Sequence, residues 1–191
     1  VETISKCTLL MKRIDDIKAK ALGIGACEKI GDVIDYDSLI KLFFSPQGRE
    51  FCYNHNYPTL ETFRSIRDEV KPYRVFVDGG NIEAYNEPYL ALIGDTHAKI
   101  KVRGVDALYH IVLMHGATAE IEASHYAVVH IQNISGGDVA IHNDKLWACC
   151  ERLKGYIHTL NRGVEYVYLV YALGTNLRNM PRYSLPLNYR A

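Results

Sequence analysis

The chain has 191 residues, of which 48% are hydrophobic and 23% are charged, as in a folded globular protein rather than a disordered segment. Its 22 Lys and Arg residues equal its 22 Asp and Glu residues, so the net charge does not favour a nucleic-acid partner or an anionic membrane surface. The apolar runs are too short to span a bilayer, and the five cysteines form neither a disulfide framework nor a zinc pattern, which predicts a cytoplasmic protein without membrane, metal or cofactor.

Residues 1–72 are expected to form a helical cap. Apolar residues at helical spacing in "ISKCTLLMKRIDDIKAKAL" predict a first helix, which Gly23 and Gly25 end. Shorter helices are expected in "CEKIGDVI", in "DSLIKLFF", after "SP" and in "LETFRSIRDEV". Side chains that accept hydrogen bonds from the first turn of a helix suggest three N-caps, which are Asp37, Ser45 and Thr59.

From Val75 onward, β-branched residues and alternating hydrophobicity replace the helical pattern. Similar units recur about every 20 residues, and the marker residues of the repeat are Gly94, Gly116 and Gly136 together with Ile100, Ile121 and Ile141. Two short strands per repeat of this length are typical of a parallel β-solenoid, also called a parallel β-helix. We therefore predict an α+β protein with a solenoid of about 3–4 coils over residues 73–145, with an antiparallel sandwich or barrel as the alternative.

Charges reverse from one repeat to the next within the predicted strands. If one inward column contains Ile82, Ile100, Ile121 and Ile141, the outward column beside it contains Glu83, Lys101, Glu122 and His142, and a second contains Asn81, Lys99, Glu120 and Ala140. Opposite charges on adjacent strands attract, so the alternation is expected to fix the register between coils. The alternative is a polar strip that binds a charged ligand or partner, with Lys101 and Glu122 as candidate contacts.

The other strand of each repeat is apolar on both sides, as in "LYHIVLM" and "YAVVHI". A sheet of this kind must be covered on its outer face, either by the helices at the N-terminus or by a second subunit. His110 and His130 are 20 residues apart, so they are expected to be neighbours in one outward column. They are candidate binding residues, but a third ligand at comparable spacing is missing, and no metal site is predicted.

Residues 146–191 are expected to complete the C-terminal end. The stretch "DKLWACCERLKGYIHTLNRG" has helical spacing and predicts a helix that caps the open end of the solenoid, and "VEYVYLVYALG" predicts a strand. The tail that follows is either loosely ordered or an arm that contacts a partner. Its candidate partner-binding residues are Arg178, Arg182, Tyr183 and Arg190.

Several phrases over residues 40–145 resemble uncharacterised bacterial proteins from mobile or prophage regions. These phrases are "LFFSPQGREFC", "ALIGDTHAKI", "VLMHGATAEIEAS" and "YAVV". Proteins of that kind pair a small helical head with a short parallel β-solenoid. The resemblance implies this architecture, and it implies no activity and no catalytic residues.

The motifs of common enzymes are missing from the sequence: it has no Gly-x-Ser-x-Gly elbow, no phosphate-binding Gly-Lys-Ser/Thr loop and no His-Glu-x-x-His. We assign no catalytic residues, and the sequence favours a non-enzymatic module that binds a protein partner, such as an inhibitor or adaptor encoded by a phage or mobile element. A homo-oligomer is a further option. The alternatives are a small-ligand or glycan-binding protein, with a site between head and solenoid, and a carbohydrate-active enzyme.

Overall fold

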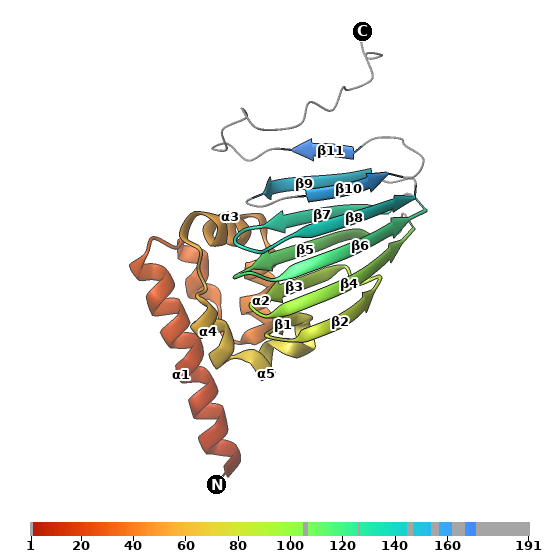
Figure 1. Ribbon diagram of the computed structural model, residues 1–191. Helices are drawn as coiled ribbons and strands as arrows, with labels where there is room; N and C mark the ends of the chain where they lie inside the picture. Colours follow the sequence, from red (N-terminus) through yellow and green to blue (C-terminus); the bar gives the residue numbers. More distant parts are fainter. Residues whose placement is uncertain are drawn as a thin grey trace.

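The structure is a computed structural model, and it describes residues 2–104, 107–125, 127–144, 147–153, 157–161 and 167–170, with side chains described from residue 12 to residue 141 outside those gaps. A group of helices at the N-terminus packs against one side of a short parallel β-solenoid (Figure 1). The predicted α+β solenoid fold is therefore confirmed, and the antiparallel alternative is wrong.

The helical segments precede the first strand. They are α1 (Glu2–Gly23), the 3₁₀ turn η1 (Glu28–Asp32), α2 (Tyr36–Phe44), α3 (Pro46–His55), α4 (Leu60–Ser65), α5 (Arg67–Val70) and the 3₁₀ turn η2 (Lys71–Tyr73). The strands are β1 (Val75–Val77), β2 (Gly80–Tyr85), β3 (Tyr89–Ile93), β4 (Thr96–Arg103), β5 (Leu108–Met114), β6 (Thr118–Ser124), β7 (Val128–Asn133), β8 (Val139–Asp144), β9 (Trp147–Leu153), β10 (Ile157–Asn161) and β11 (Val167–Val170).

Two of the three predicted N-caps are confirmed. The Ser45 side chain accepts a hydrogen bond from the backbone N–H of the third residue of α3, and Thr59 does the same for α4. The prediction of Asp37 is wrong, because Asp35 caps α2 in a reciprocal capping box with Ser38. Asp37 lies one turn from Lys41 and forms an ion pair with it.

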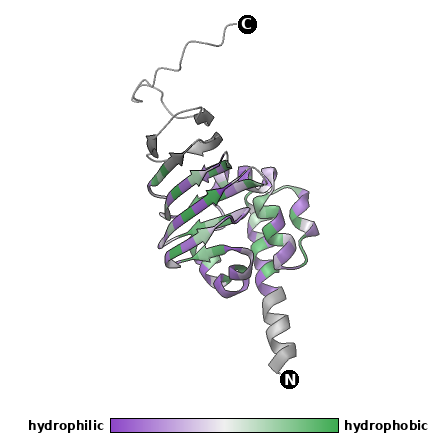
Figure 2. Cartoon of the chain, turned by 90° about the vertical axis from the view of Figure 1, so that its right-hand side faces the viewer, coloured by the Kyte–Doolittle hydropathy of each residue, from purple (hydrophilic) through white to green (hydrophobic). Residues whose placement is uncertain are grey.

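The strands of the solenoid form two parallel sheets. Among the described residues, one sheet has the order β1-β3-β5-β7-β9-β11 and the other has the order β10-β8-β6-β4-β2. The predicted inward stack of Ile100, Ile121 and Ile141 is confirmed by the strand register. Hydrophobic and hydrophilic residues alternate along strands of the second sheet such as β4 and β6, as expected when one side of that sheet faces the interior (Figure 2).

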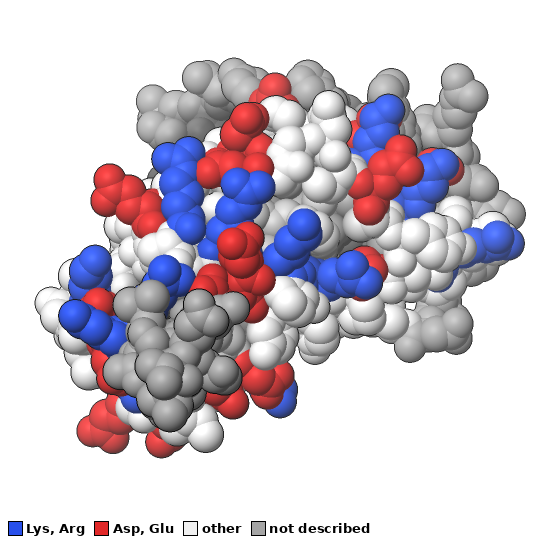
Figure 3. Space-filling model, turned by 90° about the horizontal axis from the view of Figure 1, so that it is seen from below, with Lys and Arg blue, Asp and Glu red and all other residues white. Residues whose placement is uncertain are grey.

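The predicted register of β2 is wrong by two residues. Glu83 lies beside Lys99 rather than Lys101, and Ala84 rather than Ile82 continues the isoleucine column. The charge alternation survives this shift, because Glu83, Lys99 and Glu120 follow one another up the outer face. Charges of both signs also lie intermingled on the lower end of the molecule (Figure 3).

Two hydrophobic clusters hold the fold together. One fills the solenoid and includes Ile111 and Leu113, whose side chains point between the sheets. The other lies between the helices and the outer face of the first sheet, where Val112 and Met114 pack with helical residues such as Phe63. The helices of the same chain thus cover the outer face of β1, β3 and β5, which is the intramolecular option left open by the sequence.

The predicted C-terminal capping helix is wrong. Residues 147–153 form β9 beside β7, and residues 157–161 form β10 beside β8, so both sheets continue where the helix was expected. Each completed coil presents unpaired backbone N–H and C=O groups at its edge, and pairing with the next segment satisfies them. Backbone pairing with the preceding coil therefore decides the structure of this segment, although the spacing of Leu146, Cys150 and Leu153 is that of a helix. The tail beyond residue 170 lies outside the described residues.

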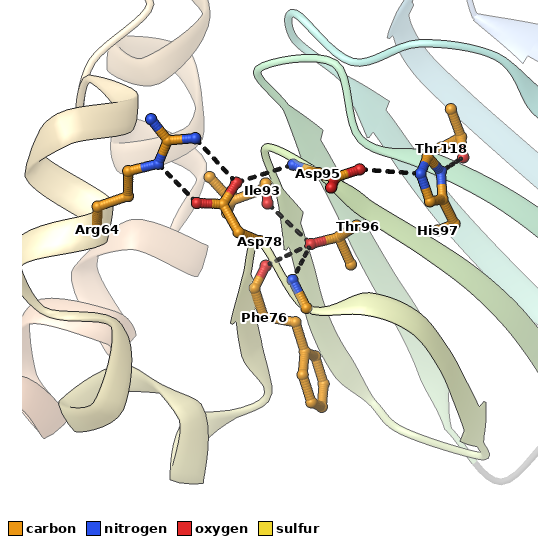
Figure 4. Close-up of polar contacts among 9 residues, drawn as sticks. Arg64, Phe76, Asp78, Ile93, Asp95, Thr96, His97 and Thr118 are labelled. Atoms are coloured by element: carbon orange, nitrogen blue, oxygen red, sulfur yellow. Dashed lines mark hydrogen bonds and ion pairs between the residues drawn. The ribbon is translucent and has the colours of Figure 1, made fainter.

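A polar junction connects the head to the first coils (Figure 4). The Asp78 carboxylate accepts hydrogen bonds from Nε of Arg64 at 2.6 Å and from the backbone N–H of Asp95 at 2.9 Å. The Thr96 hydroxyl, close by, accepts from the backbone N–H of Gly79 at 2.9 Å and donates to the carbonyl of Ile93 at 2.8 Å. The hydrogen bond from Arg64 is the main cause that lowers the pKa of Asp78.

We expect the Asp78→Asn variant to unfold at a lower temperature than the wild type at neutral pH, and to show a smaller loss of stability in acid. The folded pKa of Asp78 lies below its ordinary value of 3.8, so its ionised form stabilises the wild type above that pH, and this contribution is lost as the pH falls through the lowered pKa. Asparagine tolerates the positive φ of 45° at this position and keeps an acceptor oxygen, so the change mainly removes charge. Thermal unfolding between pH 3 and pH 7 measures both effects, and parallel curves for the two proteins would contradict the prediction.

Candidate ligand-binding site

The described part of the structure contains a pocket of about 700 Å³ between the helical head and the first sheet. Helices α2 and α3 form one wall, and residues of β3 and β5 form the other. We call this space the head pocket. Its apolar and aromatic lining comes mainly from Ile40, Phe44, Pro46, Tyr73, Pro88 and Tyr89. Pockets of 300–1,000 Å³ with a mostly apolar lining and a few polar groups are typical of small-molecule sites.

Arg49 lines the head pocket and lies beside two histidines. Its Nη1 is 3.0 Å from Nδ1 of His110 and 2.7 Å from Nδ1 of His130, and the two Nδ1 atoms are 3.1 Å apart. A guanidinium group only donates, so the ring nitrogens that bond to it are acceptors. Arg49 thus contacts both rings, which come from neighbouring strands.

The cluster of Arg49, His110 and His130 is largely removed from solvent. Arg49 is 8% exposed, which is unusual for an arginine, and His130 is also buried. Both Arg49 and His110 line the head pocket, whereas His130 lies behind them on β7. The arrangement brings a positive charge to an aromatic cavity, held in place by side chains from two strands.

An aromatic series extends from the cluster into the head pocket. The Tyr89 ring stacks on His110, with centroids 5.2 Å apart and planes 6° from parallel. Phe44 of α2 contacts the same tyrosine at a centroid distance of 5.3 Å. Tyr89 is nevertheless 50% exposed, so a large part of this wall is not covered by protein. Stacked rings of this kind offer a rigid surface to a planar ligand.

Two ion pairs lie among the pocket residues. Nη2 of Arg74 is 3.0 Å from Oε1 of Glu87, and Lys41 pairs with Asp37 along α2. The Lys41 ammonium group donates a hydrogen bond to Asp37, and this bond raises the pKa of Lys41. Lys41 is therefore charged at neutral pH. With Arg49, the pocket residues comprise three basic and two acidic side chains.

Local sequence features place Arg49 in the pocket. Ser45 ends the preceding helix and caps α3, which turns the chain sharply so that α2 and α3 lie against one another. Gly48 permits this approach, because a Cβ atom there would overlap the backbone carbonyl of Leu42. Arg49 follows directly, one turn into α3, and faces the histidine column of the sheet.

The structure brings together one pair of predicted site residues at this pocket, which His110 lines and His130 adjoins. His110 and His130 are neighbours in the register of β5 and β7, as their spacing predicted. Arg49 and Tyr89, which complete the site, were not found from the sequence. Arg49 is 61 residues from His110 and belongs to a different element, and no local pattern connects two such positions.

The other predicted site residues lie elsewhere. Lys101 and Glu122 form an exposed ion pair of 3.1 Å on the outer face of the second sheet. A second hollow, of about 890 Å³, follows the charged column of that face and is lined by Glu83, Lys99 and Glu120 among others. Its charges alternate in sign, as expected of a column that stabilises the register. Arg178, Arg182, Tyr183 and Arg190 lie outside the described residues.

No helix in the described residues combines the length and the apolar composition needed to cross a membrane. Within the same residues, His, Cys, Asp and Glu side chains do not gather in groups of three or more suited to a metal ion. Comparisons of the chain with protein-family models, with curated proteins and with solved structures found no match. The resemblance to prophage-region proteins is therefore not tested by any relative.

Proposed function

We propose that the protein binds a small organic molecule in the head pocket. The observation that carries this proposal is the pocket itself: about 700 Å³ of space between two otherwise packed layers, with a stacked aromatic wall and a buried arginine. A concave, mostly apolar space of this size with a few polar groups is typical of small-molecule sites, which supports a binding role.

The contrast with the neighbouring core supports the same proposal. A short distance along the same layer, Val112 and Met114 are fully covered by the helices. At the pocket, Tyr89 leaves half of its surface exposed, although it stacks on His110 and contacts Phe44. The head therefore covers one part of the sheet and leaves an aromatic recess over another.

A non-enzymatic module that binds a protein partner, including an inhibitor or adaptor of a phage or mobile element, stays a prediction from the sequence. Its candidate tail residues lie outside the described part of the chain. Cytoplasmic location and a homo-oligomer also stay predictions. Affinity capture on the full chain and on a chain truncated after residue 170 would test the role of the tail, since a specific partner should be lost with it.

We expect Tyr89→Ala to weaken ligand binding about tenfold, because the change removes the exposed aromatic wall, and a tenfold loss corresponds to about 1.4 kcal/mol, within the range of an aromatic contact with its buried area. A fragment library is screened against the ¹⁵N-labelled full chain by two-dimensional NMR, and hits are ranked by their dissociation constants. Shift changes are expected at Phe44, Tyr89 and His110.

Tyr85→Ala is the matched control for this experiment. Tyr85 is an exposed tyrosine on the edge strand β2 and does not line the head pocket. Its removal should leave the dissociation constants unchanged. Hits that shift no resonance of the pocket, or an equal loss of affinity in both variants, would overturn the proposed function.

A further inference from the structure

We propose that two copies of the chain pair through β2, so that the second sheet continues from one copy into the other through antiparallel edge strands. This interface is separate from the head pocket and does not depend on the proposed function. Three observations carry it: the open edge of β2, the half-buried residues at that end of the core, and an order of side chains that fits a second β2.

The head covers the edge of one sheet and leaves the edge of the other open. In the described order of the strands, β1 ends the first sheet and β2 ends the second. Helix α5 and the turn η2 pack against β1, whereas the main neighbour of β2 is β4. Figure 1 shows β2 at the lower end of the second sheet. Edge strands of this kind readily pair with a strand of another chain.

The backbone of β2 directs hydrogen-bonding groups to the open edge. The N–H groups of Gly80 and Asn86 donate to carbonyl groups of the next coil, each at 2.9 Å. Successive residues of a strand direct their backbone groups to opposite sides. The N–H and C=O groups of Asn81, Glu83 and Tyr85 therefore point away from β4, where a further strand can pair with them.

The core of the solenoid is incompletely covered at the same end. Ile82 and Ala84 belong to β2 and pack against the core, but they are only half-buried. Their neighbours on β4, Ala98 and Ile100, are 3% and 2% exposed. Beside β4 lies a coil on either side, whereas β2 has a neighbouring strand on one side alone in the described sheet. A second strand at β2 buries this apolar surface in the way that coil stacking does elsewhere.

The side chains of β2 fit a second β2 in antiparallel order. When two edge strands meet across a two-fold axis, residues with outward backbone groups face one another. With Ile82 opposite its own copy, Asn81 lies opposite Glu83 on both sides of the axis, so that an amide donor faces a carboxylate. A register centred on Glu83 instead brings two carboxylates together. The same few side chains thus supply both halves of the interface, which favours a second copy over an unrelated strand.

The charge of this end of the molecule permits such an arrangement. Lys and Arg lie intermingled with Asp and Glu on the lower end of the chain (Figure 3). Two copies that approach by this end therefore do not present extended surfaces of one sign to each other. An end with charge of one sign is suited to an oppositely charged partner and not to its own copy.

The test is size-exclusion chromatography with light scattering on the full chain, from low micromolar to submillimolar concentration. The mass of the wild type is expected to rise from 21.7 kDa toward twice that value as the concentration increases. Glu83→Pro should stay monomeric over this range, with the dissociation constant of the dimer raised at least tenfold. Proline removes an N–H that points to the open edge, and edge strands tolerate proline at such positions.

Glu83→Gln is the matched control, because it keeps the backbone N–H and should leave the dimer intact. Two further variants test the register without a proline. Asn81→Asp places a carboxylate opposite Glu83 of the second copy, and it should weaken the dimer about tenfold because two such pairs form. The double variant Asn81→Asp with Glu83→Lys creates opposite charges at these pairs and should regain the dimer. Both positions are exposed, and circular dichroism checks that each variant is folded.

The outcomes decide on the interface alone. A monomer at every concentration overturns the proposal, as does a dimer that persists in Glu83→Pro or is lost equally in Glu83→Gln. A double variant that fails to regain the dimer also overturns the pairing through β2. In the described structure no residue of β2 lines the head pocket, so each of these results leaves the proposed function unchanged. The NMR screen tests that function separately.

Discussion

Replacing Gly48 by alanine is expected to lower the free energy of unfolding by about 3 kcal/mol, a large effect for a single methyl group. The added Cβ would overlap the carbonyl oxygen of Leu42 and lie 2.8 Å from its carbonyl carbon. These are backbone atoms of α2, so no side chain can move aside, and α2 and α3 must separate. Urea denaturation of the full chain, followed by circular dichroism, measures the loss.

The same change should also weaken binding in the head pocket, because α2 and α3 form one of its walls. Gly31→Ala is the matched control: a Cβ at that position meets no atom within 4 Å, and the stability should change by less than about 0.5 kcal/mol. A Gly48→Ala protein as stable as Gly31→Ala would show that α2 and α3 do not approach as closely as described.

Ile121→Ala is expected to lower the free energy of unfolding by about 3–4 kcal/mol. Ile121 is fully buried in the solenoid, between Ile100 of the coil before and Ile141 of the coil after. Truncation removes contacts with both neighbours and leaves a cavity that the paired backbone cannot close. Ile121→Val, which removes a single methyl group, should cost about 1 kcal/mol, and both are measured by urea denaturation.

Glu122→Gln tests the other side of the same strand. Glu122 pairs with Lys101 across the coils, but both side chains are more than half exposed, and exposed ion pairs contribute about 1 kcal/mol at most. A loss below that value is expected. If Glu122→Gln costs as much as Ile121→Ala, the charge column rather than the buried isoleucine stack is the main source of cohesion between coils.

The solenoid could be predicted because its physical cause is repeated in the sequence. Strands stacked in register place similar residues beside one another, and Ile100, Ile121 and Ile141 do so at nearly equal intervals. The first coil was misplaced because Ile82 is an isoleucine in the wrong column: the smaller Ala84 lies beside Ile100. Matching by residue type thus shifted β2 by two positions, a change that keeps every side chain on its correct face.

Longer-range features could not be read in this way. The segment from Trp147 to Leu153 has helical spacing over a single short stretch, and pairing with β7 decides its structure. The two histidines of the site were predicted from the coil length, but Arg49 comes from a helix whose docking position depends on the shapes of two assembled surfaces. The position of Arg49 is set by packing between the helical head and the solenoid, and no repeating sequence pattern marks residues that meet in this way.

The way in which the coils stack has a consequence for how such a chain can vary. The hydrophobic contact with the helices involves strand and turn residues up to Ile134, and the histidine cluster ends on β7. Insertion of a whole coil after that point adds a rung without disturbing the head pocket, because each coil pairs only with its neighbours. The number of distal coils can therefore change without changing the residues that line the head pocket.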